Sequence, residues 1–218
     1  MKFIGIILLL LTSIFLIACS ANQASNKISN SELENLASKY GGVYIFNQKF
    51  VEEIEKREAE RKELSKTLGD KIRSNPRKIK QGDKFITIYD VDMTLINKQL
   101  PQTLSNGKKY YTRWMDYERE TGKKAEIPKT YINKIKEFIG DDFLKEEPRI
   151  YPKYMYFDGK EISVIKIYLS YDYIKTKYGL FGDENRGISF KQDTFGVKSG
   201  DNIFYLINGK FERIGKDK

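Results

Sequence analysis

The chain has 218 residues and a formal net charge of +9, and its 40% hydrophobic and 32% charged residues are typical of a globular protein. It contains no histidine and one cysteine, Cys19. These absences exclude Ser-His-Asp and Cys-His triads, structural zinc sites built from Cys and His, and haem ligated by His. Any catalysis would rest on Asp, Glu, Lys, Tyr, Ser or Thr.

The N-terminal segment has the pattern of a secretory signal peptide. Lys2 supplies a positive charge, and an almost wholly apolar run from Phe3 to Ile17 follows. As a helix this run would cover about 20–25 Å, which is short of the roughly 30 Å hydrocarbon core of a bilayer. It ends in Leu16-Ile17-Ala18-Cys19. The alternative is an uncleaved N-terminal helix anchor that contains an ordinary buried or free cysteine.

Residues 1–20 resemble the bacterial lipoprotein class, whose lipobox has an aliphatic residue, a small or aliphatic one, a small one and then cysteine. The resemblance implies cleavage between Ala18 and Cys19. It also implies diacylglycerol on the Cys19 sulfur and usually a further acyl chain, such as palmitate, on the new amine. Two or more chains anchor a protein stably. We therefore expect a lipid-anchored protein of a bacterial membrane that faces the periplasm or the exterior, in the outer membrane if the cell has two.

The composition predicts three segments: a signal peptide over residues 1–18, a lipidated flexible tether over 19–31, and one globular domain over 32–218. The tether is predicted because residues 21–31 are rich in Asn, Ser, Gln and Ala. We expect the domain to be helix-rich over 47–140 and strand-rich over 149–214. Its length suffices for a sizeable core.

Local patterns in the first half of the domain predict both helices and strands. Gly41-Gly42 indicates a turn before a short strand that ends at Phe46, and Asn47 is a suitable N-cap for a helix to about Leu68. A long strand is expected over Lys84–Ile96. The remaining expectations are a hairpin-type turn at Ser105–Lys108, an ambiguous helix or strand over Tyr110–Tyr117, and a helix from Pro128 that ends at Gly140.

The C-terminal part reads as an antiparallel meander. Asp158-Gly159 and Asn208-Gly209 are strong hairpin signals between apolar strands. We therefore predict an α+β fold: a mostly antiparallel sheet with two principal helices on one side.

One motif has a catalytic pattern. Asp90-Val91-Asp92-Met93-Thr94 resembles the first motif of the haloacid dehalogenase-like phosphatases. That resemblance implies Asp90 as nucleophile, Asp92 as general acid and base, and a Mg²⁺ ion between substrate and carboxylates. The best continuation of the family pattern lies within fourteen residues after Ser170, too few for parallel crossovers. The competing interpretation places both aspartates on the solvent face of an antiparallel strand whose other face is buried.

Two clusters carry weaker binding signals. The first is a basic stretch around Pro76 that comprises Arg73, Arg77, Lys78, Lys80 and Lys84. It is either a site for anionic head groups or polymer or a solvated loop. The second comprises Tyr110, Tyr111, Trp114 and Tyr117 with Lys108, Lys109 and Arg113. It is either a binding site for a glycan or polyanion or a group of core aromatic residues.

The sequence thus predicts an envelope lipoprotein with a non-catalytic binding or structural role, without a catalytic, cofactor-binding or metal-binding residue. Its expected partners are the membrane, through lipid on Cys19, and an envelope protein or anionic polymer. Nucleic acid is not expected for an exported protein. Two alternatives remain: a Mg²⁺-dependent phosphatase that uses Asp90 and Asp92, and an immunity-type inhibitor of an envelope-targeting toxin.

Overall fold

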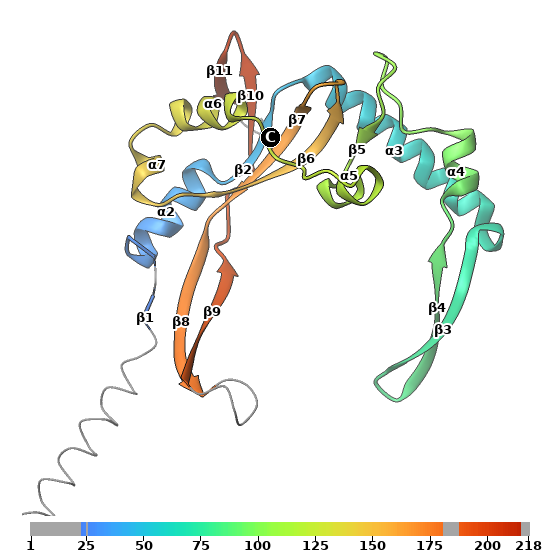
Figure 1. Cartoon of the computed structure of the whole chain (residues 1–218), viewed down its shortest axis with the longest axis horizontal. Coiled ribbons are helices and arrows are strands. Elements are labelled where there is room, and N and C mark those ends of the chain that lie inside the picture. Colours follow the sequence, from blue (N-terminus) through green and yellow to red (C-terminus); the bar gives the residue numbers. More distant parts are fainter. Residues whose placement is uncertain (1–22, 25, 181–187, 215–218) are drawn as a thin grey trace, which may run out of the picture.

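The computed structural model describes residues 23–24, 26–180 and 188–214. A six-stranded sheet forms the centre of the molecule, and two long β-hairpins, β3–β4 and β8–β9, extend from the body toward the same side (Figure 1). The α+β class is confirmed. Within the described residues no helix is both long enough and apolar enough to cross a membrane.

Six α-helices are described, together with a 3₁₀ turn over Gly69–Ile72. The helices are α2 (Asn30–Tyr40), α3 (Gln48–Leu68), α4 (Thr94–Gln99), α5 (Trp114–Thr121), α6 (Lys129–Ile139) and α7 (Asp142–Lys145). The strands of the central sheet are β2 (Gly42–Ile45), β5 (Tyr110–Tyr111), β6 (Arg149–Phe157), β7 (Ile162–Ser170), β10 (Asn202–Ile207) and β11 (Lys210–Arg213). The other strands are β1 (Gln23–Ala24), β3 (Arg73–Gln81), β4 (Lys84–Val91), β8 (Asp172–Leu180) and β9 (Ile188–Gly196).

The central sheet has the strand order β11-β10-β2-β7-β6-β5. Only β2 and β10 pair in parallel; the other neighbours are antiparallel. The hairpins predicted at Asp158-Gly159 and Asn208-Gly209 are confirmed as β6–β7 and β10–β11. The C-terminal strands do not form one uninterrupted sheet, however, because β2 lies between β7 and β10 and β8 pairs with β9 and β1 outside it.

Both faces of the central sheet are covered by helices. Successive side chains of a strand point to opposite faces, and Tyr44 and Ile45 of β2 belong to two different cores. The Tyr44 core contains residues of α2, α6 and α7, whereas the Ile45 core contains residues of α3. The expectation that the two principal helices lie on one side of the sheet is therefore wrong: α6 and α3 cover opposite faces.

Several local predictions are confirmed by the ends of the helices. The Asn47 side chain accepts a hydrogen bond from the Phe50 N–H at 3.0 Å and so caps α3. Helix α6 ends at Gly140, whose φ of 67° lies in the left-handed region that favours glycine. The ambiguous segment after residue 109 contains both forms, the short strand β5 followed by α5.

The tether was predicted too long. Helix α2 begins at Asn30, and Ser29 and Glu32 form a reciprocal capping box at its start. Ile28 already lies against the main core. The folded body therefore begins before residue 31, because Ser29 caps the helix and Asn26 bonds to Glu146 and Asp172 of the body instead of belonging to a flexible linker.

The strand predicted over Lys84–Ile96 is also too long, since β4 ends at Val91 and Thr94 begins α4. The Asp92 carboxylate accepts a hydrogen bond from the Thr94 N–H at 2.9 Å, which closes a local turn. The turn ends the strand at this point, although the alternating apolar pattern of the sequence continues through Met93 to Leu95.

Candidate functional site

A pocket of about 330 Å³ lies where β2 ends and α3 begins. The pairing of β6 with β7 shifts between Tyr154 and Met155, which leaves Ile165 as an additional residue in β7. The Ile165 carbonyl accepts hydrogen bonds from the Phe46 N–H at 2.9 Å and the Asn47 N–H at 3.4 Å. This bulge fixes the turn from strand to helix and thereby holds the pocket open on one side of the turn.

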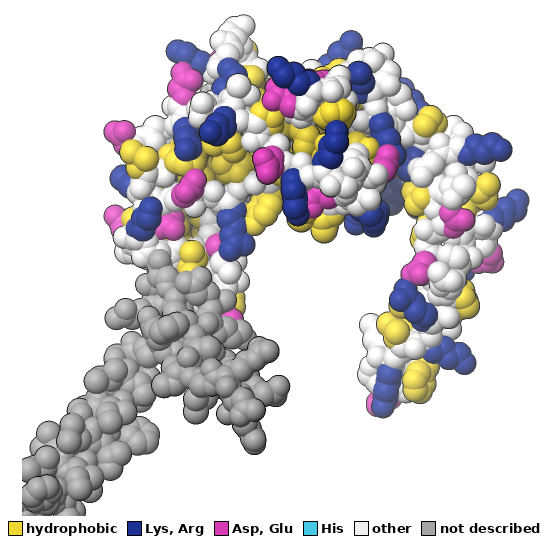
Figure 2. Space-filling model, in the orientation of Figure 1, with side chains coloured by type: hydrophobic (Ala, Val, Ile, Leu, Met, Phe, Trp, Pro, Cys, Tyr) yellow, Lys and Arg dark blue, Asp and Glu magenta, His cyan; other side chains and the backbone are white. Residues whose placement is uncertain are grey.

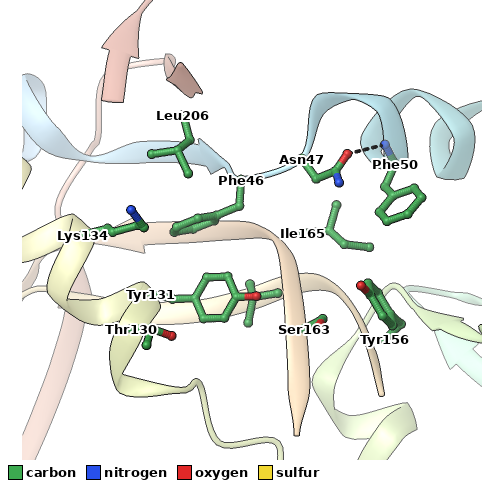
Figure 3. A pocket seen from close by; sticks show the side chains of 11 residues that line it. Phe46, Asn47, Phe50, Thr130, Tyr131, Lys134, Tyr156, Ser163, Ile165 and Leu206 are labelled. Carbon is green, nitrogen blue, oxygen red and sulfur yellow. Dashed lines mark hydrogen bonds between the residues drawn. The ribbon is translucent and has the colours of Figure 1, made fainter. Parts of the chain in front are cut away.

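Aromatic side chains form two opposite walls of the pocket (Figure 3). Phe46 and Tyr131 meet edge to face, with ring centroids 4.9 Å apart and an interplanar angle of 79°. Phe50 and Tyr156 form a second edge-to-face pair, 5.9 Å apart at 87°. Such pairs are worth about 0.5–1.5 kcal/mol beyond their area burial, which stabilises the two walls. The remaining lining residues are Asn47, Thr130, Lys134, Ser163, Val164, Ile165 and Leu206.

Lys134 is the one charged side chain that lines this pocket. It comes from α6 and is half-buried. In the described ranges no carboxylate lies within ion-pair distance of its ammonium group, although Glu137 borders a neighbouring hollow that Lys134 also lines. A half-buried ammonium group without an ion-pair partner favours a ligand that brings an acceptor or a negative charge.

The donor set of the pocket includes hydroxyl groups and one ammonium group. The lining residues supply hydroxyl groups from Thr130 and Ser163, the phenol groups of two tyrosines and the Lys134 ammonium group, but no carboxylate that could act as a general base beside them. Across the described part of the chain no group of three or more acidic, Cys or His side chains is arranged to hold a metal ion. The pocket can thus hold a small ligand with an apolar body and an acceptor group.

Asp90 and Asp92 do not line this pocket; Asp90 lies in strand β4 and Asp92 directly after it, and their carboxylates bond to different partners. The Asp90 carboxylate forms an ion pair with Arg77 and accepts a hydrogen bond from Asn75 at 3.3 Å. Asp92 lies beyond the end of β4, where hydrogen bonds from the Thr94 side chain and backbone lower the pKa of its carboxyl group. Strand β4 pairs only antiparallel, with β3. This geometry gives the phosphatase alternative no support.

The expected buried face of the Asp90 strand is absent, which corrects the competing interpretation as well. Phe85 is 71% exposed and Tyr89 is 45% exposed, although both lie on the face opposite Asp90. The basic stretch from Arg73 to Lys84 belongs to the same hairpin and is exposed; it is a strand pair and not a loop.

The aromatic cluster divides into core and surface. Tyr110, Tyr111 and Tyr117 are at least 94% buried, and burial, with Glu120 as a lesser cause, raises the pKa of Tyr111 to about 12. Trp114 is 37% exposed and borders a smaller hollow of about 220 Å³ together with Tyr168. The core interpretation therefore holds for the three tyrosines.

Cys19 and Ala18 lie outside the described residues. The sequence analysis placed Phe46 at the end of a short strand and Asn47 at a helix cap, but it did not connect them with Tyr131 or Lys134. Comparison with protein-family models, curated proteins and solved structures finds no match to this chain.

Proposed function

We propose that this chain is a lipid-anchored bacterial envelope protein whose folded body binds a small ligand without catalysing a reaction on it. The lipobox Leu16-Ile17-Ala18-Cys19 supports the anchor. The binding role depends on one observation: the aromatic pocket at the start of α3 has Lys134 on its wall, and Lys134 has no ion-pair partner among the described residues.

The ligand class follows from the lining. Phenyl and phenol rings favour a flat or ring-shaped apolar body, and Lys134 favours a carboxylate, sulfonate or phosphate group on it. A volume of about 330 Å³ lies at the small end of the range of ligand pockets, so the ligand has the size of one or two rings.

The anchor is tested in cells that express the chain with radiolabelled palmitate. We expect label in the wild-type protein, and recovery of the protein in the membrane fraction. Cys19→Ser should remove the label and leave the signal segment uncleaved. An unlabelled wild-type protein, or a Cys19→Ser variant that is processed like the wild type, would contradict the anchor.

The pocket is tested with 1-naphthalenesulfonate, a fluorescent two-ring aromatic probe with one negative charge. Lys134→Ala should weaken its binding about tenfold, because a charge-assisted contact in a partly buried site is lost. Lys129→Ala, at the exposed start of the same helix, serves as control and should leave binding unchanged. Equal affinity of both variants and the wild type in a fluorescence titration would argue against this site.

A further inference from the structure

The β3–β4 hairpin stands apart from the body (Figure 1). It follows α3 and the 3₁₀ turn and forms a sheet of its own, in which no third strand takes part among the described residues. Almost every side chain from Arg73 to Val91 is exposed. An isolated two-stranded hairpin is only marginally stable in water and is usually stabilised by a third strand or by a helix packed against it. In the described structure this hairpin has neither.

Large apolar side chains occupy both faces of the hairpin. Phe85 is the most exposed of them at 71%, and Tyr89 and Val91 lie on the same face. On the other face Ile79 stands opposite Ile86, and both are more than one-third exposed. Single exposed apolar residues are ordinary, but a run of them along one arm marks an interaction surface.

Basic residues alternate with the apolar ones. Lys80 stands opposite Phe85, and the Arg73 guanidinium lies over the Tyr89 ring at 5.3 Å. The hairpin carries five basic residues against the two acidic residues Asp83 and Asp90. Figure 2 shows this mixture of Lys and Arg with apolar side chains along the free arm.

We propose that the β3–β4 hairpin docks on an anionic lipid surface. Aromatic and aliphatic side chains enter the boundary between head groups and acyl chains, while long Lys and Arg side chains keep their charges among the phosphates. Both strands have an edge without a partner strand in the described structure, so the hairpin cannot enter the hydrocarbon core and lies in the head-group region.

A lipid surface fits this arm better than a protein that adds a strand. One of the two free edges, β3, contains Pro76, a bulge between Ser74 and Arg77, and two lysines, and the other, β4, carries Lys84 at its start and Asp90 near its end. Proline, bulges and lysines on an edge strand are features that discourage pairing with another strand. The exposed side chains, and not the strand edge, are therefore the contact.

The direction of the arm agrees with the proposed anchor, and this step rests on the proposed function. The tip of the hairpin and strand β1 lie toward the same side of the molecule (Figure 1). Asn26 lies seven positions after Cys19, so their Cα atoms are at most about 25 Å apart. The nine residues of β3 extend over about 30 Å. A body held this close to the bilayer brings the hairpin within reach of it.

The test uses the full lipidated protein in vesicles of phosphatidylglycerol with brominated acyl chains, which quench tryptophan fluorescence at close range. Phe85→Trp is made with Trp114→Phe, so that the hairpin carries the single indole. We expect quenching and a blue shift of its emission. Ile207→Trp in the same background is the matched control: Ile207 is 36% exposed at the β10–β11 end, opposite the arm (Figure 1). This position should not be quenched.

The second part of the test changes the charge of the hairpin or of the lipid. Lys78→Glu combined with Lys80→Glu, or vesicles of phosphatidylcholine with the same brominated acyl chains, should abolish the quenching of Phe85→Trp while the protein stays on the vesicles through its lipid. If Phe85→Trp is not quenched in vesicle-bound protein, the inference is wrong, and a protein partner becomes the alternative ligand of the hairpin. Equal quenching at both positions overturns it as well. If the wild-type protein does not bind the vesicles at all, both the docking of the hairpin and the proposed lipid anchor are wrong.

Discussion

Asp142 joins the end of α2 to α7. Its carboxylate accepts hydrogen bonds from the Lys145 ammonium at 2.7 Å, the Tyr40 hydroxyl at 2.8 Å and the Lys39 ammonium at 3.2 Å. The bonds from Lys145 and then Tyr40 hold the pKa of Asp142 well below its usual range. Since the folded state favours the ionised form, Asp142 stabilises the fold above the unfolded pKa of about 3.9, and this contribution is lost as the pH falls further.

We therefore expect Asp142→Asn to lower the free energy of unfolding by about 1 kcal/mol at pH 7, after allowance for solvent screening. Below about pH 4 the variant should lose less further stability than the wild type. Urea unfolding between pH 7 and pH 2 measures both effects. Asp83→Asn, in the exposed hairpin turn, is the control; parallel pH profiles of wild type and Asp142→Asn would contradict the prediction.

Asn202 is the buried polar residue that connects α2 with the central sheet. Its side chain is 3% exposed, and its amide group donates to the carbonyls of Ser38 at 2.7 Å and Gly41 at 2.9 Å. Asn202→Ala should lower the free energy of unfolding by about 2–3 kcal/mol, because the buried Gly41 carbonyl and the partly buried Ser38 carbonyl lose their donor. Asn35→Ala, on the exposed side of α2, should not be destabilising. Denaturant titration that finds the two variants alike would refute this role.

Among the elements, β2 depends most on close backbone approach. Gly42 has a φ of +143°, and a Cβ atom there would lie 2.3 Å from the Asn202 carbonyl oxygen across the parallel pair. Gly42→Ala should therefore cost about 3 kcal/mol or more. Gly107→Ala also introduces a side chain at positive φ but meets no atom within 4 Å, so it should cost only about 1–2 kcal/mol. Equal losses in thermal unfolding would show that strain, and not collision, dominates.

The elements that local chemistry determines were predictable from the sequence. Such elements are specified by the hydrogen bonds and dihedral angles of single residues or short turns. Examples are Asn47 at the start of α3, Gly140 at the end of α6, the Asp158-Gly159 turn and the Asn208-Gly209 turn. The insertion of β2 between β7 and β10 was not predictable, because it depends on pairing between segments far apart in the chain. The pocket was missed for the same reason: Phe46, Tyr131 and Ile165 come from three such segments.

At the scale of the whole molecule, stability should be unevenly distributed. The hairpin β6–β7 lies within the sheet and contributes Met155, Ile167 and Leu169 to the main core, whereas β3–β4 has both faces in solvent. Backbone amides of β3–β4 should exchange with deuterium far faster than those of β7, because local opening exposes little further apolar surface. Mass spectrometry of exchanged peptides measures this; equal protection of the two hairpins would contradict the prediction.

The parallel pairing of β2 with β10 has a consequence for how the chain folds. The paired residues Gly42 and Asn202 are separated by 160 positions, so the middle of the sheet is completed only when the last strands are available. Contacts of such long range make folding slow. The central sheet therefore stays incomplete until the last strands of the chain have been synthesised, which would keep the chain unfolded for the export that we propose.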